Sequence, residues 1–196
     1  NVLDALTITY DDGVRLFSIY GDEGSGRRFT IQHFCAQKGL RCITVDGAKL
    51  FGYDFNFVQQ ALWAVARECL LTEACCCLTN LSYREEDKER FFGYMDLCFE
   101  RLSDRGVAVF THSRDKLPLR EMTQLDFAHL ELPTPDNRER IALWQHYADG
   151  YALGEDVDLT ELATKFLFTG GKIKSALHQG RTLASMDKEI LISRDK

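Results

Sequence analysis

The segment GDEGSGRR, at positions 21–28, has the residue types of a loop that binds phosphate. Such a loop follows the pattern G-x-x-x-x-G-K-[ST] between a strand and a helix, because backbone N–H groups wrap the phosphates and the helix N-terminus adds partial positive charge. Gly21 and Gly26 have the required spacing, and Gly24 is an additional glycine. The candidate nucleotide-binding residues here are Gly21, Asp22, Glu23, Gly24, Ser25, Gly26, Arg27 and Arg28.

The two positions that would complete the chemistry depart from this pattern. Arg27 replaces the lysine that reaches the terminal phosphates, and Arg28 replaces the hydroxyl residue that holds magnesium. Arginine can bind phosphate, but its planar guanidinium is bulkier than an ammonium group and has no lone pair for a cation. Asp22 and Glu23 add negative charge that disfavours an anion. We expect weakened binding and strongly impaired hydrolysis, or else a glycine turn that only connects a strand to a helix.

The elements around this loop predict an α/β fold. Short apolar runs alternate with longer helical patterns, which favours helices layered on a mostly parallel sheet. The expected strands are 16–20, 41–46, 74–78, 107–110 and 127–132, and the expected helices are 27–38, 56–72 and 84–106. Apolar residues at helical spacing are Phe57, Ala61, Trp63, Ala64, Cys69 and Leu70 in one helix and Phe91, Met95, Cys98 and Leu102 in another.

The chain changes character near Pro133, after which only helices are expected. Typical N-cap and first-turn residues mark three helix starts, namely Thr134 with Pro135, Asp158 with Glu161, and Thr169. The first of these helices should extend to Tyr147, and the third should carry an apolar stripe of Ile173, Ala176, Leu177 and Leu183. We therefore expect an α/β nucleotide-binding-like core at 1–133 and a small helical subdomain at 134–196.

The order of these parts resembles an AAA+ ATPase module of the P-loop NTPase class over nearly the whole chain. The resemblance rests on the glycine loop, on CCCLTNL at 75–81, on GVAVFTHSRD at 106–115, on LPTPDNRERIALW at 132–144 and on FTGGKIKSALHQGRTLA at 168–184. It implies a parallel five-stranded sheet with flanking helices, followed by an all-helical lid. It also implies that the glycine loop is a degenerate Walker A motif.

The resemblance also assigns roles beyond the glycine loop. Thr79 and Asn80 stand where the family has the magnesium-binding aspartate and the catalytic glutamate of Walker B, so neither position can carry negative charge. Thr111 and His112 stand at the tip of the strand that senses the terminal phosphate. Lys174, or else Lys172, would lean over the phosphates from the lid, and Arg114 or Arg120 would serve as the arginine finger for a neighbouring subunit.

These substitutions imply a degenerate AAA+ module that binds ATP or ADP weakly or not at all, holds magnesium poorly, and hydrolyses little. It would act as a scaffold or as the regulatory half of a larger ATPase, with protein partners or another ATPase module, and an oligomer would be compatible with this role. The alternatives are an active ATPase in which Arg27 replaces the lysine, a small P-loop metabolite kinase, and an unrelated α/β interaction domain.

Composition limits the remaining classes of function. The formal net charge of −6 argues against non-specific binding to nucleic acid, and the sequence has no apolar run of membrane-spanning length. Because the first residue is Asn, we expect a fragment of a longer protein. The seven cysteines do not fit a disulfide framework, and the run at 75–77 alternates between the faces of a strand. We expect small buried apolar cysteines in a reducing cytoplasm, and no metal site.

Overall fold

The computed structural model describes residues 2–186 and 191–192 of the 196-residue chain. The chain forms two compact units, the first from 1–21 with 27–132 and the second from 22–26 with 133–196. Positions 187–190 and 193–196, at the end of the predicted helical subdomain, lie outside the described residues. Among the described helices, none has both the length and the apolar character that crossing a bilayer requires.

The first unit contains one parallel sheet of five strands. The strands are β1 (Leu16–Gly21), β2 (Arg41–Asp46), β3 (Ala74–Thr79), β4 (Val109–Ser113) and β5 (Ala128–Leu132), in the spatial order β2-β3-β4-β1-β5. Every ladder is parallel, so the predicted α/β class with a parallel sheet is confirmed. The fourth strand starts later and ends later than predicted, because its pairing with β1 continues to Ser113.

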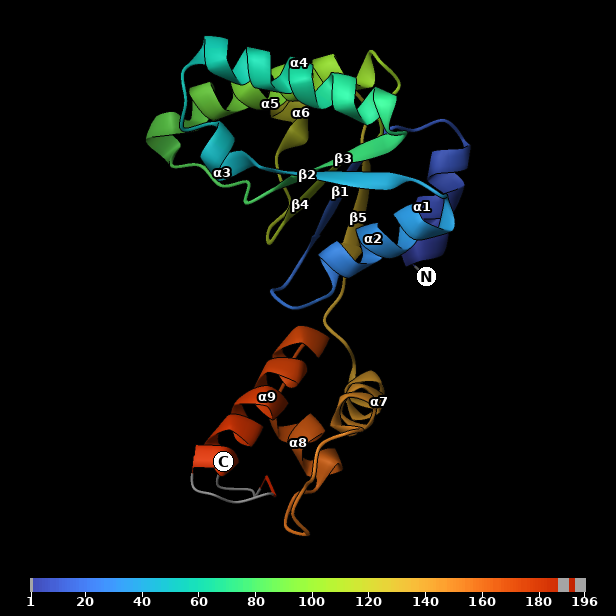
Figure 1. Ribbon diagram of the computed structural model, residues 1–196, viewed down its shortest axis with the longest axis vertical. Coiled ribbons are helices and arrows are strands. Elements are labelled where there is room, and N and C mark those ends of the chain that lie inside the picture. Colours follow the sequence, from blue (N-terminus) through green and yellow to red (C-terminus); the bar gives the residue numbers. More distant parts are fainter. Residues whose placement is uncertain (1, 187–190, 193–196) are drawn as a thin grey trace. The chain divides into compact units, whose positions relative to one another are not determined.

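Helices cover both faces of the sheet (Figure 1). They are α1 (Val2–Asp11), α2 (Arg27–Gln37), α3 (Gly47–Leu50), α4 (Phe55–Leu71), the 3₁₀ turn η1 (Glu85–Asp87), α5 (Lys88–Ser103) and α6 (Leu119–Met122). One core lies between the sheet and α4 with α5, and the other lies between the sheet and α1 with α2. The three cysteines of β3 alternate as predicted, because Cys76 belongs to the first core and Cys75 and Cys77 belong to the second.

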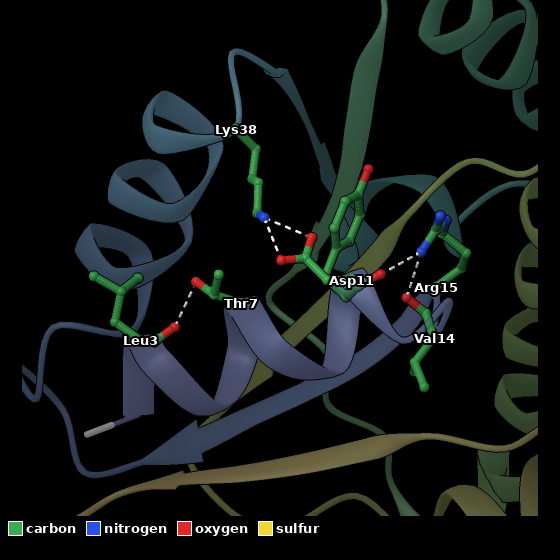
Figure 2. Close-up of polar contacts among 7 residues, drawn as sticks. Leu3, Thr7, Asp11, Val14, Arg15 and Lys38 are labelled. Carbon is green, nitrogen blue, oxygen red and sulfur yellow. Dashed lines mark hydrogen bonds and ion pairs between the residues drawn. The ribbon is translucent and has the colours of Figure 1, made fainter.

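Helix α1 was not predicted, although its sequence carries the signal for it. Leu3, Leu6 and Tyr10 are spaced by three and four residues, and Leu6 is fully buried. Figure 2 shows the two contacts that hold the C-terminal end of this helix. Lys38 Nζ lies 2.6 Å from Asp11 Oδ1, and Arg15 Nη1 donates a hydrogen bond of 2.9 Å to the carbonyl oxygen of Tyr10.

The buried face of α4 agrees with the predicted one only in part. Its buried residues are Val58, Leu62, Ala66 and Cys69, so the prediction was confirmed for Cys69, whereas Phe57, Trp63 and Leu70 are exposed. The α4 sequence offers apolar residues on more than one face, and packing against α5 and β3 selects one of them. In α5 the prediction was confirmed, since Phe91, Met95, Cys98 and Leu102 are all buried, although the α-helix begins at Lys88.

The second unit contains the helices α7 (Asn137–Ala148), α8 (Leu159–Lys165) and α9 (Gly170–Met186). The predicted N-cap at Thr134 was wrong, because Asp136 forms a reciprocal capping box with Glu139 and the helix starts after it. Asp158 caps α8 as predicted. The small core of this unit consists of Trp144, Ala148, Ala163, Ile173 and Leu177 with partly buried neighbours. Leu183 was predicted to lie in the apolar stripe of α9 but is exposed, and Ala184 is buried instead.

Candidate functional site

A cavity of about 200 Å³ lies at the carboxyl ends of β2, β3 and β4. Ligands of open parallel sheets bind outside the carboxyl ends of the strands, near the point where the strand order reverses. In this sheet the order reverses around β1, which lies between β4 and β5. The polar residues that line the cavity are Arg28 and Gln32 from α2, Thr44 from β2, Thr79 and Asn80 from the end of β3, and His112 from β4. The structure therefore brings together four of the candidates singled out from the sequence.

The end of β3 presents a hydroxyl and an amide in place of carboxylates. Thr79 Oγ1 donates a hydrogen bond of 3.3 Å to the carbonyl oxygen of Val45. Asn80 has a φ of +54°, in the left-handed region that asparagine tolerates better than most residues. Its Nδ2 donates to Asp46 Oδ2 over 3.0 Å. The side chains at the predicted Walker B positions are thus engaged by neighbouring protein groups.

Asp46 is a carboxylate in direct contact with Asn80, and it was not predicted from the sequence. It is paired with Thr79 in the β2–β3 register, so it lies at the same edge of the sheet. Its Oδ1 accepts a hydrogen bond of 3.2 Å from the backbone N–H of Lys49, and this bond caps α3. An aspartate directly after an apolar strand and before GAKL is the sequence signal that could have identified it. Both oxygens already accept hydrogen bonds from the protein.

The two candidates on β4 have different surroundings. Thr111 is fully buried, and its Oγ1 donates to the carbonyl oxygen of Phe17 at 3.5 Å, so it does not line the cavity. His112 lines the cavity and is half-buried. Burial, together with the guanidinium groups of Arg27 and Arg28, lowers its pKa below the ordinary value of 6.5. The imidazole is therefore neutral at physiological pH, and its Nδ1 has no hydrogen-bond partner among the described residues.

The wall of this cavity carries positive charge on the side of α2. Arg27 and Arg28 are the first two residues of α2, and both act on the imidazole of His112. The residues that line the cavity include no carboxylate, and the only charged one is Arg28. Such a cavity favours an anion, and magnesium would lack the carboxylate ligands that it prefers.

The glycine loop at 22–26 packs within the second unit. Gly24 and Gly26 have φ values of +77° and +96°, conformations that residues with side chains rarely adopt. Thr169 Oγ1 donates to the carbonyl oxygen of Glu23 over 2.7 Å, and the Gly171 N–H donates to the carbonyl oxygen of Gly24 over 2.9 Å. The loop is thus hydrogen-bonded to the start of α9 through its own carbonyl groups.

This contact is close enough to exclude side chains. A Cβ atom on Gly171 would lie 2.7 Å from the Cα of Gly24, so both positions require glycine for the backbones to meet. One N–H group in the first turn of α9 therefore donates its hydrogen bond to the loop, although the N–H groups of a helix N-terminus could otherwise donate to an anion. Lys172 and Lys174 are exposed near the start of the same helix, and Arg114 and Arg120 are exposed in the first unit. The roles assigned to these four residues remain predictions.

Three cysteine sulfurs also meet in the first unit, which the sequence analysis did not anticipate. The Sγ atoms of Cys35, Cys42 and Cys75 all lie within 4.8 Å of one another. The sequence-based prediction concerned only whether the three cysteines of the run 75–77 could bind one metal ion, whereas these three residues come from α2, β2 and β3. The alternation of Cys75 and Cys77 along a strand, with Cys42 in the preceding strand, was the available signal.

Comparisons with known proteins do not assign the chain to a family. No protein-family model matches the sequence, and no curated protein matches it significantly. The resemblance to AAA+ modules therefore rests on the motifs of this chain and on their order.

Proposed function

We propose that this chain is a degenerate AAA+ ATPase-like module that binds ATP or ADP weakly at most and hydrolyses little. It serves as a scaffold or regulatory half of a larger ATPase. The observation that carries the proposal is that the end of β3 presents Thr79 and Asn80 to the cavity, and the resemblance gives these positions to the residues that hold magnesium and activate water. Phosphoryl transfer depends on metal ions that neutralise the developing charge, and these side chains carry none.

The charge around the cavity supports the same conclusion. Arg28 lies where a magnesium-binding hydroxyl would be needed, and Arg27 adds a second guanidinium close to His112. Asp46 does not freely supply the missing carboxylate, because magnesium would have to compete with the hydrogen bonds that its two oxygens accept from Lys49 N–H and Asn80 Nδ2. An anion remains favourable here, so phosphate can be attracted without a metal ion. We therefore expect any nucleotide binding to be independent of magnesium.

The contact between the glycine loop and α9 supports weak binding. The carbonyl oxygens of Glu23 and Gly24 accept hydrogen bonds from Thr169 and Gly171, and backbone atoms of Gly24 and Gly171 are in close contact. Phosphates that needed the first-turn N–H groups of α9 would have to replace a hydrogen bond that the protein already makes. That replacement reduces the net free energy of binding.

Calorimetric titration with ATP and with ADP, each with and without magnesium, tests the proposal. We expect weak binding that magnesium does not change, and a loss of that binding in Arg28→Gln. Arg105→Gln is the matched control, because this exposed arginine lies at the opposite end of β4 and stacks over Trp63. Tight magnesium-dependent binding, or ATP turnover that falls in Arg27→Ala, would overturn the proposal and favour an active ATPase.

A gain-of-function variant tests the stated cause. Arg28→Thr combined with Thr79→Asp restores a hydroxyl and a carboxylate while leaving Asn80, whose left-handed backbone disfavours a larger residue. We expect magnesium to increase the affinity of this double variant for ATP and to leave the wild type unaffected. If magnesium does not change the affinity of a folded double variant for ATP, the absence of these two ligands does not explain the weak binding of magnesium.

A further inference from the structure

The side of the sheet that faces α2 carries a cluster of thiols. Cys42 and Cys75 are register partners on the parallel strands β2 and β3, so their side chains project from the same face. Cys35 reaches them from α2, which packs on that face, and its Sγ lies 3.2 Å from that of Cys75. All three Sγ atoms lie within 4.8 Å of one another. Cys77 lies two residues beyond Cys75 on the same face.

This cluster is buried on one side and open on the other. Cys35 and Cys75 are only 3% and 1% exposed, whereas Cys42 is partly exposed. Cys42 and Cys77 line the cavity at the carboxyl ends of the strands, so a small ion can reach the cluster from solvent. A metal site requires both a set of preformed ligands and a path by which the ion enters, and this cluster has both.

We propose that Cys35, Cys42 and Cys75 bind a single thiophilic cation, with Zn²⁺ as its representative. Zinc–thiolate bonds of ~2.3 Å in a tetrahedral arrangement place the sulfurs about 3.8 Å apart, so the observed spacing needs only small side-chain shifts. Cys77, which lines the cavity together with Cys42, or a water molecule from the cavity can take the fourth position. Soft thiolate ligands select zinc and copper(I) over magnesium and calcium.

The electrostatics of the cluster fit such a cation. Three thiolates around a divalent ion leave one excess negative charge, and the guanidinium group of Arg28, which lines the same cavity, offsets it. The thiol protons leave as the cation replaces them.

The bound cation would fix α2 to β2 and β3. Helix α2 begins at Arg27, directly after the glycine loop, and its Cys35 lies in the last turn. Three ligands from three elements would add cross-links that hydrophobic packing alone does not supply. This inference is independent of the proposed nucleotide role, because its ligands are thiols and its test contains no nucleotide.

The test is a titration of the metal-free, reduced 196-residue chain with Zn²⁺ in competition with a chromophoric chelator. We expect one equivalent to bind, and each of Cys35→Ala, Cys42→Ala and Cys75→Ala to weaken the affinity roughly 100-fold or more. Cys69→Ala is the matched control, because Cys69 is also 1% exposed but belongs to the other core. Circular dichroism verifies that each variant is folded, and Cys42→Ser, at a partly exposed position, is the least disruptive of them.

Two further readouts separate metal ligation from a structural role of the thiols. Co²⁺ in place of Zn²⁺ should give the sulfur-to-cobalt charge-transfer absorption of a thiolate site, and Cys42→Ser should abolish it. Zinc addition to weakly buffered protein should release about two or three protons, since the ligands bind as thiolates. The proposal is overturned if the folded wild type binds no stoichiometric zinc, if Cys42→Ser binds as tightly as wild type, or if Cys69→Ala weakens binding equally.

Discussion

Replacing Gly171 with alanine tests the contact between the glycine loop and α9, which lies within the second unit. The added Cβ would lie 2.7 Å from Gly24 Cα, 3.1 Å from its carbonyl oxygen and 3.3 Å from its carbonyl carbon. These are backbone atoms, so no side-chain rotation can relieve the overlap. The same substitution threatens the hydrogen bond of 2.9 Å from Gly171 N–H to Gly24 O. The loop and the start of α9 must therefore separate.

The expected magnitude combines three effects. Overpacking typically costs ~1–3 kcal/mol, and the lost hydrogen bond costs about 0.5–1.5 kcal/mol. Alanine is favoured over glycine in a helix by up to about 1 kcal/mol, which offsets part of the loss. We expect Gly171→Ala to lower the free energy of unfolding of the second unit by about 1–3 kcal/mol.

Gly170→Ala is the matched control for this experiment. It adds the same methyl group one residue earlier, where the Cβ would lie 3.6 Å from Tyr147 and 3.7 Å from Leu143 in ordinary van der Waals contact. We expect this control to be neutral or slightly stabilising. Both variants are compared by urea unfolding in a Trp63→Phe background, in which the buried Trp144 is the only tryptophan and reports on the second unit.

Equal free energies of unfolding in the two variants would refute this reasoning. If Gly171→Ala and Gly170→Ala unfold with free energies within about 0.5 kcal/mol of each other, the close approach of the loop to α9 does not constrain the protein. A double-mutant cycle with Gly24→Ala gives a second check. If Gly171→Ala lowers the free energy of unfolding by the same amount in the Gly24→Ala background as in the wild type, the strain lies elsewhere, because two changes at one contact should not be additive.

Two further predictions concern buried polar groups. Arg140 is 7% exposed and donates to the carbonyl oxygens of Ala163 at 2.9 Å and Pro135 at 2.7 Å, so we expect Arg140→Met to destabilise the second unit by about 1.5–3 kcal/mol in urea unfolding. A loss below about 0.5 kcal/mol would contradict this. The pKa of His112 is lowered by burial and by the two arginines of α2, so the unfolded chain takes up its proton first. The contribution of His112 to the stability of the first unit should be complete above the ordinary pKa of 6.5 and should decline as pH falls toward the lower folded pKa. The variant His112→Gln should reduce this decline. Equal slopes of the free energy of unfolding against pH in the variant and the wild type would refute the prediction.

Much of the fold was predictable because its signals are local. The strand at 41–46 was predicted to the residue, and Asp158 was correctly identified as the cap of α8. The apolar face of α5 was also predicted, since it follows helical spacing without competing apolar positions. In α4 the prediction was confirmed for Cys69 but not for Phe57, Trp63 and Leu70, because apolar residues occur on several faces of the helix and only the packing partners decide which are buried. The N-cap of α7 was misplaced for a similar reason, because Thr134 and Asp136 are both suitable caps.

The residues of the candidate site were predictable where they lie near a strand end or follow the glycine loop. Thr79, Asn80 and His112 were singled out in the first way and Arg28 in the second, and all four line the cavity. Asp46 was missed because its importance comes from pairing with the neighbouring strand. Thr111 was expected at the cavity, but the alternation of β4 turns it toward the protein interior.

The amino-acid sequence by itself determined the types of groups available to this protein. It has arginines directly after the glycine loop and no carboxylate at the end of β3, and its local periodicity determines the order of helices and strands. Only the tertiary structure decided which groups meet. The hydrogen bonds between the loop and α9 join residues 23 and 24 to residues 169 and 171, and the thiol cluster joins Cys35, Cys42 and Cys75. Such contacts depend on strand register and helix packing, which arise from burial across the whole chain and leave no local pattern.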